Sequence, residues 1–350
     1  MKDEPELLTA MLRAEAGQAE IYRPGPYWQP YQQRVTRAIH RYGLGDFRAR
    51  PAIGKGYADT PTTRAEDVWA GQGSLRYALK RALARAPVLR GMFTDYEAIV
   101  DNNVDVGRRY RDAYLETHFG NWFRTLIANK PLPDTAHAGC TDLVRVGDQE
   151  VARLYLEFLM RIDNYARHVD FGRMRTALEI GGGFGAWVHL LLSRYPNVRK
   201  VAYLDIPPMI YVGTQYLRHF FGPAVRDFRQ TDTGGSIRFA NDDSLEIVCL
   251  CPWQIERLEA PLDLFWNTSS FAEMTPAIVG NYARHVNRLM KPDGALCVLI
   301  NKASKRDPAR TSTPDQIFAA FEGKVGFKTF DPAVEIDGHA LYSLGRPVSA

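Results

Sequence analysis

Cysteine is scarce in this chain of 350 residues, which has only Cys140, Cys249, Cys251 and Cys297. No two of them form a C-x-x-C pair, so we expect neither a disulfide framework nor a zinc site. The charged beginning, Met1–Glu6, has no apolar signal core, and the chain has no run of about 18 apolar residues. These absences predict a cytoplasmic protein with no membrane-spanning helix.

The chain also lacks a strong excess of either charge. Its 44 Lys and Arg residues against 40 Asp and Glu residues leave a formal net charge of +4. No basic tail or stripe of the kind that binds nucleic acid stands out, so we expect no nucleic-acid partner. With 45% hydrophobic and 24% charged residues, the composition is typical of a globular protein, and the length favours two packed parts.

The pattern of the sequence changes near residue 170. Before this point, helical patterns alternate with loops rich in proline and glycine, and the last helix is expected over 149–168. After it, short apolar runs alternate with helical patterns, beginning with 176–180 and 186–195. This alternation predicts an α/β fold with a mostly parallel sheet covered by helices on both faces. We therefore expect a helical N-terminal region over 1–170, on the acceptor side, and a Rossmann-like domain over 171–350.

The other elements expected in this domain follow the same rhythm. They are strands over 201–205, 245–250, 262–266, 295–300, 327–330 and 339–344, with helices over 210–221, 276–290 and 316–321. Lys291–Gly294 is expected to end the helix that precedes it. Sheets of this kind bind ligands at the carboxyl ends of their strands, so the candidate residues are sought there.

A glycine-rich segment, Gly181–Gly185, joins the first strand of the alternation to the following helix. Glycines at such a junction let the backbone turn tightly and approach a ligand closely. We expect Gly181, Gly182 and Gly183 to contact a cofactor. The spacing of Gly181, Gly183 and Ala186 also satisfies the dinucleotide pattern G-x-G-x-x-A, so it leaves a nicotinamide or flavin nucleotide open.

Two carboxylates separate these alternatives. Glu179 stands at the end of the first strand beside the loop, where a pyrophosphate would meet a like charge. S-adenosylmethionine carries no phosphate, and its cationic sulfonium and ammonium groups suit an anionic wall. Asp205 ends the second strand, next to Ile206, and can accept hydrogen bonds from both ribose hydroxyls. Glu179, Asp205 and Ile206 are therefore predicted to bind S-adenosylmethionine.

The loop after the third strand, Cys251–Gln254, commonly borders the adenine in this fold. In one interpretation Trp253 stacks on the adenine ring and Gln254 forms hydrogen bonds with its edge. In the other interpretation Trp253 is a packing residue of the core. The residues themselves leave both interpretations open.

Three segments resemble the bacterial putative sugar O-methyltransferases: Leu178–Gly185, the turn Leu204–Pro208, and the block Leu264–Met274. Asn301, at the end of the fifth strand, is a further point of similarity. The resemblance implies a class I methyltransferase fold, with a seven-stranded sheet whose last strand is antiparallel. It also implies S-adenosylmethionine as the methyl donor, S-adenosylhomocysteine as the product and a sugar hydroxyl as the acceptor.

The segment after the fourth strand faces the transferable methyl group in this topology. We expect Glu273 to act as a general base or to orient the acceptor, although a carboxylate just before Pro276 also stabilises the start of a helix. Asn267 is expected to contact the cofactor, and Ser270 the substrate. His137, in a loop bounded by prolines, is a second candidate base.

Two further features bear on the ligands. Tyr27 and Trp28 could stack on a sugar ring, with Asn301 also near the substrate, or they could seat the N-terminal segment on the core. Asp242 and Asp243 precede a strand instead of following one, so they are interpreted as a solvated turn and no metal is predicted.

The predicted acceptor is a small-molecule glycoside or a glycan precursor. A non-sugar hydroxyl, as in a polyketide or a phenol, stays open as an alternative, because the fold does not distinguish acceptors. A binding protein that kept the fold but lost catalysis is a second alternative. The oligomeric state is also left open, with a homodimer among the options.

Overall fold

A computed structural model describes residues 1–50, 53, 119–130, 132–301, 307, 309–334 and 340–348. The chain divides into two units, one made of Met1–Phe47 with Leu154–Ala350 and the other of Arg48–Arg153. This division differs from the predicted boundary near residue 170, because residues 1–47 and 154–170 belong to the same unit as the sheet. The acceptor-side role predicted for the N-terminal region stays a prediction.

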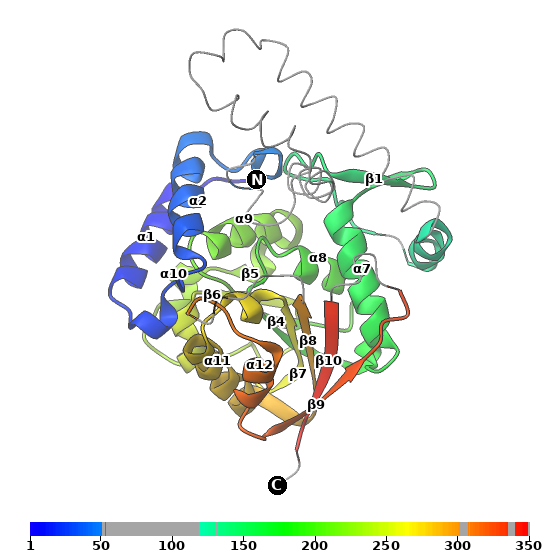
Figure 1. Ribbon diagram of the computed structural model, residues 1–350. Coiled ribbons are helices and arrows are strands. Elements are labelled where there is room, and N and C mark those ends of the chain that lie inside the picture. The colour runs from blue at the N-terminus through cyan, green and yellow to red at the C-terminus, as the bar shows by residue number, and fades with distance from the viewer. Residues whose placement is uncertain are drawn as a thin grey trace, which may run out of the picture. The chain divides into compact units, whose positions relative to one another are not determined.

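The first unit is built on one sheet (Figure 1). Its described strands are β3 (Thr176–Ile180), β4 (Lys200–Leu204), β5 (Val225–Arg226), β6 (Glu246–Leu250), β7 (Leu262–Thr268), β8 (Met290–Asn301), β9 (Val325–Phe330) and β10 (Ala340–Pro347). Their order in the sheet is β5-β6-β4-β3-β7-β8-β10-β9. Neighbours from β5 to β8 are parallel, and β10 is antiparallel to both β8 and β9. The two-residue β5 is an edge strand beyond the seven predicted.

The strand order reverses at β3. From β3 the chain continues to β4 and β6 on one side, whereas β7 and β8 lie on the other side. Right-handed crossovers therefore place α8 (Ala186–Arg194) and α9 (Met209–Phe221) on one face of the sheet and α11 (Pro276–Leu289) on the opposite face, as Figure 1 shows. The crevice at such a reversal, beyond the carboxyl ends of β3, β4 and β7, is where ligands bind in open α/β sheets.

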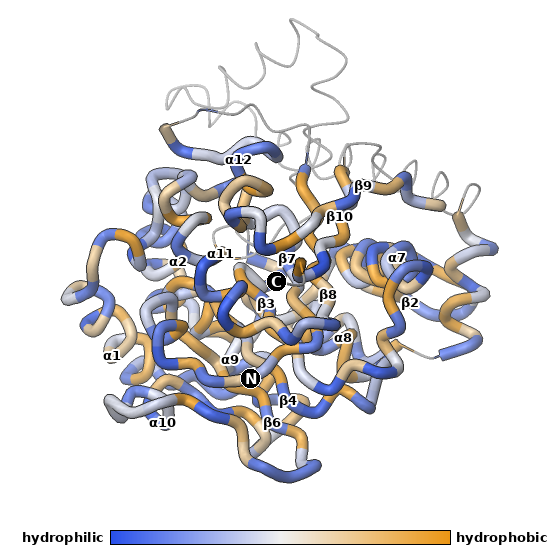
Figure 2. Tube along the Cα trace, turned by 90° about the horizontal axis from the view of Figure 1, so that it is seen from below, coloured by the Kyte–Doolittle hydropathy of each residue, from blue (hydrophilic) through white to orange (hydrophobic). Residues whose placement is uncertain are grey.

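The central strands form the core. Every residue of β4 and β6 is buried, as expected for parallel strands that are covered on both faces. Hydrophobic residues gather along these inner strands, whereas hydrophilic residues follow the outer loops (Figure 2). All four cysteines are buried, and none of them forms a disulfide bond with another described residue. In the described part of the chain, no helix is both long and apolar enough to cross a membrane.

Helices from the N-terminal segment join this unit. They are α1 (Pro5–Ala16), the short η1 (Glu20–Tyr22) and α2 (Gln29–Tyr42), and α1 packs near α10 (Phe228–Thr231). The buried side chains of α1 are those of Leu7, Leu8, Met11 and Glu15, which share one face of the helix. One carboxylate, Glu15, thus lies on the apolar face of α1.

The second unit contains a hairpin of β1 (Leu143–Val146) and β2 (Gln149–Ala152). We predicted a helix over 149–168, but α7 runs only over Arg153–Ala166, so the prediction was wrong for its first four residues. Gly147, with φ of 61°, makes the turn that lets residues 149–152 pair back on β1.

A second difference concerns Lys291–Gly294, which we expected to form a turn after a helix. Instead, α11 ends at Leu289, and β8 begins directly at Met290 and continues through this segment. The pairing of β8 with β7 shifts register between Leu262 and Leu264. The irregular pairing accommodates Pro292, which has no backbone N–H to donate.

Candidate cofactor and active site

The glycine-rich loop after β3 is held in a conformation that only glycine adopts easily. Gly181, Gly183 and Gly185 have φ values of 75°, 62° and 85°. The Gly181 N–H donates to the carbonyl of Leu204, with an N···O distance of 2.8 Å, which ties the loop to the end of β4. A Cβ atom on Gly181 would overlap the hydroxyl of Ser270, and one on Gly182 would overlap the carboxylate of Glu179.

Glu179 is a buried carboxylate in this crevice. Its side chain is 2% exposed, and no described residue donates a hydrogen bond to its Oε2 atom. Burial raises the pKa of Glu179 well above its ordinary value, and the negative charge of Asp205 raises it further. A buried carboxylate without a partner is unfavourable, so this position is suited to a ligand that brings a positive charge.

Asp205 lies at the carboxyl end of β4, as predicted. Its Oδ2 accepts from the Gly183 N–H at 2.8 Å, and its Oδ1 accepts from the Ile206 N–H at 2.7 Å. Burial raises the pKa of Asp205 to about 7, although these two backbone donors oppose the shift. Each carboxylate oxygen has a second lone pair, so Asp205 can still accept hydrogen bonds from ribose hydroxyls.

These observations test whether S-adenosylmethionine fits the residues present. Two buried carboxylates with raised pKa values would be stabilised in their ionised form by an ammonium or sulfonium group, and would repel a pyrophosphate. Glu179 would face the cationic part of the cofactor, Asp205 its ribose, and Gly181–Gly183 would let its chain approach the backbone. The residues therefore fit this cofactor better than a dinucleotide.

The end of β7 contacts the same loop from the other side. The Asn267 side chain donates to the Ile180 carbonyl at 3.0 Å and to Ser270 Oγ at 2.6 Å, and it accepts from the Phe271 N–H at 3.2 Å. Ser270 Oγ donates to the same Ile180 carbonyl at 3.0 Å. Both side chains thus hold the loop in place. The predicted cofactor contact of Asn267 and substrate contact of Ser270 stay predictions.

Glu273 closes η8 (Ser270–Glu273), beside the crevice. Its Oε2 accepts a hydrogen bond from Trp28 Nε1 at 3.0 Å, so two residues that we singled out separately lie in contact. Burial raises the pKa of Glu273 to about 7; the bond from Trp28 opposes this shift, and the charge of Asp205 adds to it. A carboxyl group with a pKa near neutrality is well suited to accept a proton.

Two aromatic residues of the N-terminal segment, Tyr27 and Trp28, lie near this carboxylate. Tyr27 stacks on Tyr31 with ring centroids 5.8 Å apart and packs edge-on against Trp28 at the same distance. Burial and the charge of Glu273 raise the pKa of Tyr27 to about 12. Arg310 donates to the Pro26 carbonyl at 3.1 Å and so ties the segment to a distant part of the chain. Tyr27 and Trp28 therefore lie at the expected acceptor side of the sheet.

The predicted adenine contacts are placed differently from our first interpretation. In η7 (Pro252–Arg257), the Gln254 side chain accepts from the Cys251 N–H at 2.9 Å and donates to Thr231 Oγ1 at 2.9 Å. Trp253 is 7% exposed and packs edge-on against Phe228, 6.1 Å between centroids. The packing interpretation of Trp253 is favoured, and its contact with adenine stays a prediction.

Two further candidates are placed by the fold alone. Asn301 is the last residue of β8, exposed at the carboxyl edge and paired with Ala340. His137 belongs to the unit Arg48–Arg153, where Arg48 donates to its backbone carbonyl at 3.1 Å. The roles predicted for Asn301 and His137 stay predictions.

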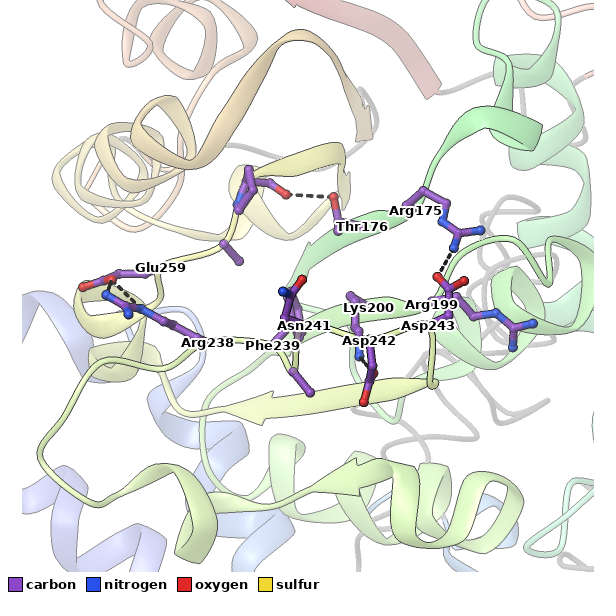
Figure 3. A pocket seen from close by; sticks show the side chains of 13 residues that line it. Arg175, Thr176, Arg199, Lys200, Arg238, Phe239, Asn241, Asp242, Asp243 and Glu259 are labelled. Atoms are coloured by element: carbon purple, nitrogen blue, oxygen red, sulfur yellow. Dashed lines mark hydrogen bonds and ion pairs between the residues drawn. The ribbon is translucent and has the colours of Figure 1, made fainter.

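A pocket of about 330 Å³ opens at the amino edge of the sheet, on the far side from the glycine-rich loop. Figure 3 shows Arg175 turned toward Asp243 and Arg238 toward Glu259, and both contacts are ion pairs. Lys200 pairs with Asp242 at 2.8 Å. Because the acids of this pocket are paired with cations, it has no excess of negative charge to attract a cationic cofactor. The aspartates that we interpreted as a solvated turn are members of these ion pairs.

One buried residue near the crevice escaped the sequence analysis. Glu15 on α1 is 8% exposed, and its carboxylate lies beside Gln32, which donates to its Oε2 at 2.7 Å. Its signal was a glutamate on the helix face that carries Leu7, Leu8 and Met11. That signal was missed because the pattern of the helix does not indicate which part of the sheet the N-terminal segment packs against.

Comparisons with known proteins agree with this geometry. Residues 147–236 match the family model of the O-methyltransferase domain. No curated protein matches the chain. The strand order, the antiparallel β10 and the glycine-rich loop after β3 are those of the class I methyltransferase fold.

The solved structures that resemble this chain are distant in sequence. The mitomycin 7-O-methyltransferase MmcR is 17% identical, with a TM-score of 0.40 over 56% of this chain and 55% of that one. Human N-acetylserotonin methyltransferase, in complex with S-adenosylmethionine, is 13% identical, with a TM-score of 0.38 over 56% and 54%. The N-methyltransferase NodS from Bradyrhizobium japonicum WM9 is 13% identical, with a TM-score of 0.35 over 56% and 95%. The match spans about half the length of the first two proteins.

Proposed function

We propose that this protein is an S-adenosylmethionine-dependent O-methyltransferase. The observation that carries the proposal is the buried carboxylate of Glu179, which lies against the glycine-rich loop and whose Oε2 receives no hydrogen bond from any residue that the structure describes. A cationic cofactor would stabilise the ionised form of this carboxylate, whereas the negative charge of a phosphate would be repelled by it. The match of residues 147–236 to the O-methyltransferase domain supports the same class of reaction.

Bound S-adenosylmethionine supplies an electrophilic methyl group on sulfur. The oxygen of the acceptor forms the new bond to the methyl carbon while the carbon–sulfur bond breaks, and sulfur keeps the electron pair of that bond. The chain must align oxygen, carbon and sulfur, which is catalysis by proximity. The acceptor hydroxyl also loses a proton.

We assign the receipt of this proton to Glu273. Its pKa of about 7 lets it be ionised before the reaction and still hold the proton afterwards. The hydrogen bond that Trp28 Nε1 donates to Oε2 of Glu273 orients the carboxylate. In this proposal the other oxygen, Oε1, accepts the proton of the acceptor hydroxyl. Substitution of Glu273 by Gln should lower kcat by roughly 10²- to 10⁴-fold.

For the acceptor we propose a sugar hydroxyl, on a glycosylated small molecule or a glycan precursor. The resemblance of the blocks Leu204–Pro208 and Leu264–Met274 to sugar O-methyltransferases supports this choice. The rings of Tyr27 and Trp28 beside Glu273 also support it, because aromatic faces stack on sugar rings. In this proposal the segment 1–47 serves the acceptor side.

Calorimetric titration with S-adenosylhomocysteine tests the cofactor. Folded protein that fails to bind it contradicts the whole proposal. Mass spectrometry of a panel of glycosides and their aglycones, incubated with S-adenosylmethionine, tests the acceptor. An added methylene mass on glycosides supports the sugar, the same gain on aglycones alone favours a polyketide or phenolic hydroxyl, and cofactor binding without any transfer indicates a non-catalytic binding protein.

A further inference from the structure

The N-terminal helix α1 places a carboxylate at the cofactor side of the sheet. Glu15 lies on the buried face of α1 and is 8% exposed. Among the described residues, none donates a hydrogen bond to its Oε1 atom. Burial raises the pKa of Glu15 to about 7, although the bond from Gln32 and the charge of Arg23 oppose the shift. Such a group has no evident structural task.

Two observations place Glu15 near the carboxyl ends of β4 and β6. Gln32 Nε2 donates both to Glu15 Oε2 and to the Pro207 carbonyl, each at 2.7 Å, and Pro207 is two residues after Asp205. The charge of Glu15 is also the strongest charge acting on Cys251, whose pKa burial raises well above its ordinary value. Cys251 directly follows β6, and the Asp205 N–H donates to Leu250, the last residue of β6, at 3.3 Å.

This is the region that an adenine base would occupy. Asp205 faces the ribose in the proposed function, and the base is one glycosidic bond away, over the ends of β4 and β6. Gln254, which we first expected at the edge of the base, already uses its amide to accept from Cys251 and to donate to Thr231. In the same region, Glu15 offers Oε1, an acceptor to which none of the described residues donates.

We propose that Glu15 accepts a hydrogen bond from the exocyclic amine of the adenine, so that helix α1 completes the base-binding end of the cofactor site and selects for a 6-amino purine. This inference rests on the proposed function. It assigns to the first helix of the chain a direct part in cofactor recognition, with Gln32 as the residue that positions the carboxylate.

The test compares two ligands by calorimetry at about pH 8.5, above the pKa of Glu15. One ligand is S-adenosylhomocysteine and the other is S-inosylhomocysteine, in which an oxygen replaces the 6-amine. The wild-type protein should bind the adenine compound roughly tenfold tighter, as expected for a hydrogen bond to a charged group. Glu15→Leu should lose this preference by weakening the adenine compound alone, whereas Glu15→Gln, which keeps an acceptor oxygen, should retain most of it.

Glu6→Leu is the matched control, because Glu6 is an exposed carboxylate on the same helix and should leave both affinities unchanged. Equal affinity of the wild-type protein for the two ligands overturns the inference, and so does an equal loss of both ligands in Glu15→Leu. Thermal unfolding checks that each variant is folded. If Glu15→Leu is unfolded, the two wild-type affinities together with Glu15→Gln decide the question. Failure of the wild-type protein to bind S-adenosylhomocysteine contradicts the proposed function itself.

Discussion

The two edges of the central sheet treat their acidic residues in opposite ways. At the amino edge, Asp242 pairs with Lys200, and this bond, with those from Ser244, lowers the pKa of Asp242 to about 2. At the carboxyl edge, Asp205 and Glu273 each have a pKa near 7, and that of Glu179 is raised well above its ordinary value, in each case mainly through burial. Asp242 at the first edge is thus paired with a cation, whereas in the described part of the chain no Lys, Arg or His forms an ion pair with the three acids of the second edge.

This difference identifies the ligand site better than the shape of the surface does. An open pocket lies at the amino edge, but its acids are already paired with Arg175, Lys200 and Arg238. The carboxyl edge contains the acids whose ionisation is unfavourable in the protein alone. Binding of a cationic ligand is most favourable at this edge, because the ligand supplies the positive charge that stabilises the ionised carboxylates.

The largest expected effect is on cofactor affinity. Glu179→Gln should weaken binding of S-adenosylhomocysteine by about 100-fold, since it removes the charge that faces the ammonium group. It should not lower the free energy of unfolding, because a neutral amide is less costly to bury than a carboxylate. Calorimetry and urea denaturation measure the two quantities. Glu259→Gln at the amino edge serves as control, and an equal loss of affinity in both variants would contradict the contrast between the edges.

The next effect concerns stability. Lys200 and Glu246 are both 7% exposed and pair at 3.4 Å. Lys200→Met should lower the free energy of unfolding by about 2 kcal/mol, less than a fully isolated buried charge would cost, because Arg226 still pairs with Glu246. Affinity for S-adenosylhomocysteine should change less than about twofold. A variant with full stability, or one that is folded but no longer binds, would refute this prediction.

A smaller effect is expected from pH. The folded pKa of Asp205 is raised to about 7, so below that pH the carboxyl group of Asp205 holds a proton that it must release before both of its oxygens can accept hydrogen bonds from the ribose of the ligand. Affinity for S-adenosylhomocysteine should therefore rise about tenfold between about pH 6 and pH 8. Adenosine, which carries the same ribose, should show a similar rise in the same titrations. A flat profile for S-adenosylhomocysteine would remove the role of these carboxyl groups.

The raised pKa of Asp205 affects the free energy of unfolding in the opposite direction to the ligand affinity. Because Asp205 ionises near pH 4 in the unfolded chain but near pH 7 in the folded one, its contribution to stability falls as the pH rises between these values. Asp242, with its lowered pKa, contributes stability above its unfolded pKa, and this contribution is lost as the pH falls toward about 2.

The smallest effect is expected at the surface of the amino edge. Arg238 and Glu259 are both largely exposed, so Arg238→Ala should change the free energy of unfolding by less than about 0.5 kcal/mol. Urea denaturation in low and high salt is the measurement. A loss above about 1 kcal/mol would show that this edge has a structural role beyond its screened ion pairs.

The alternation of strands and helices after residue 175 was readable in the sequence, and β3 was predicted with its observed bounds, Thr176–Ile180. The spacing of the apolar residues and the positions of glycine and proline between the elements are local properties of the chain. The positions of Glu179 and Asp205 followed from the same rhythm, because the carboxyl ends of parallel strands lie at one edge. The hairpin of β1 and β2 was missed, because a short strand pair after a helical pattern has no distinctive period.

Only the tertiary structure decided which groups meet. Trp28 and Glu273 are 245 residues apart, and nothing in the local pattern of either one indicates the other. The engagement of Gln254 with Cys251 and Thr231, and the arrival of Glu15 near Cys251, likewise depend on how distant segments pack. The sequence by itself therefore determined the order of the elements, the glycine-rich turn and the acids at the strand ends. Which acids find a partner, and which are left for a ligand, was decided by packing, because burial and charge pairing are properties of the folded surroundings.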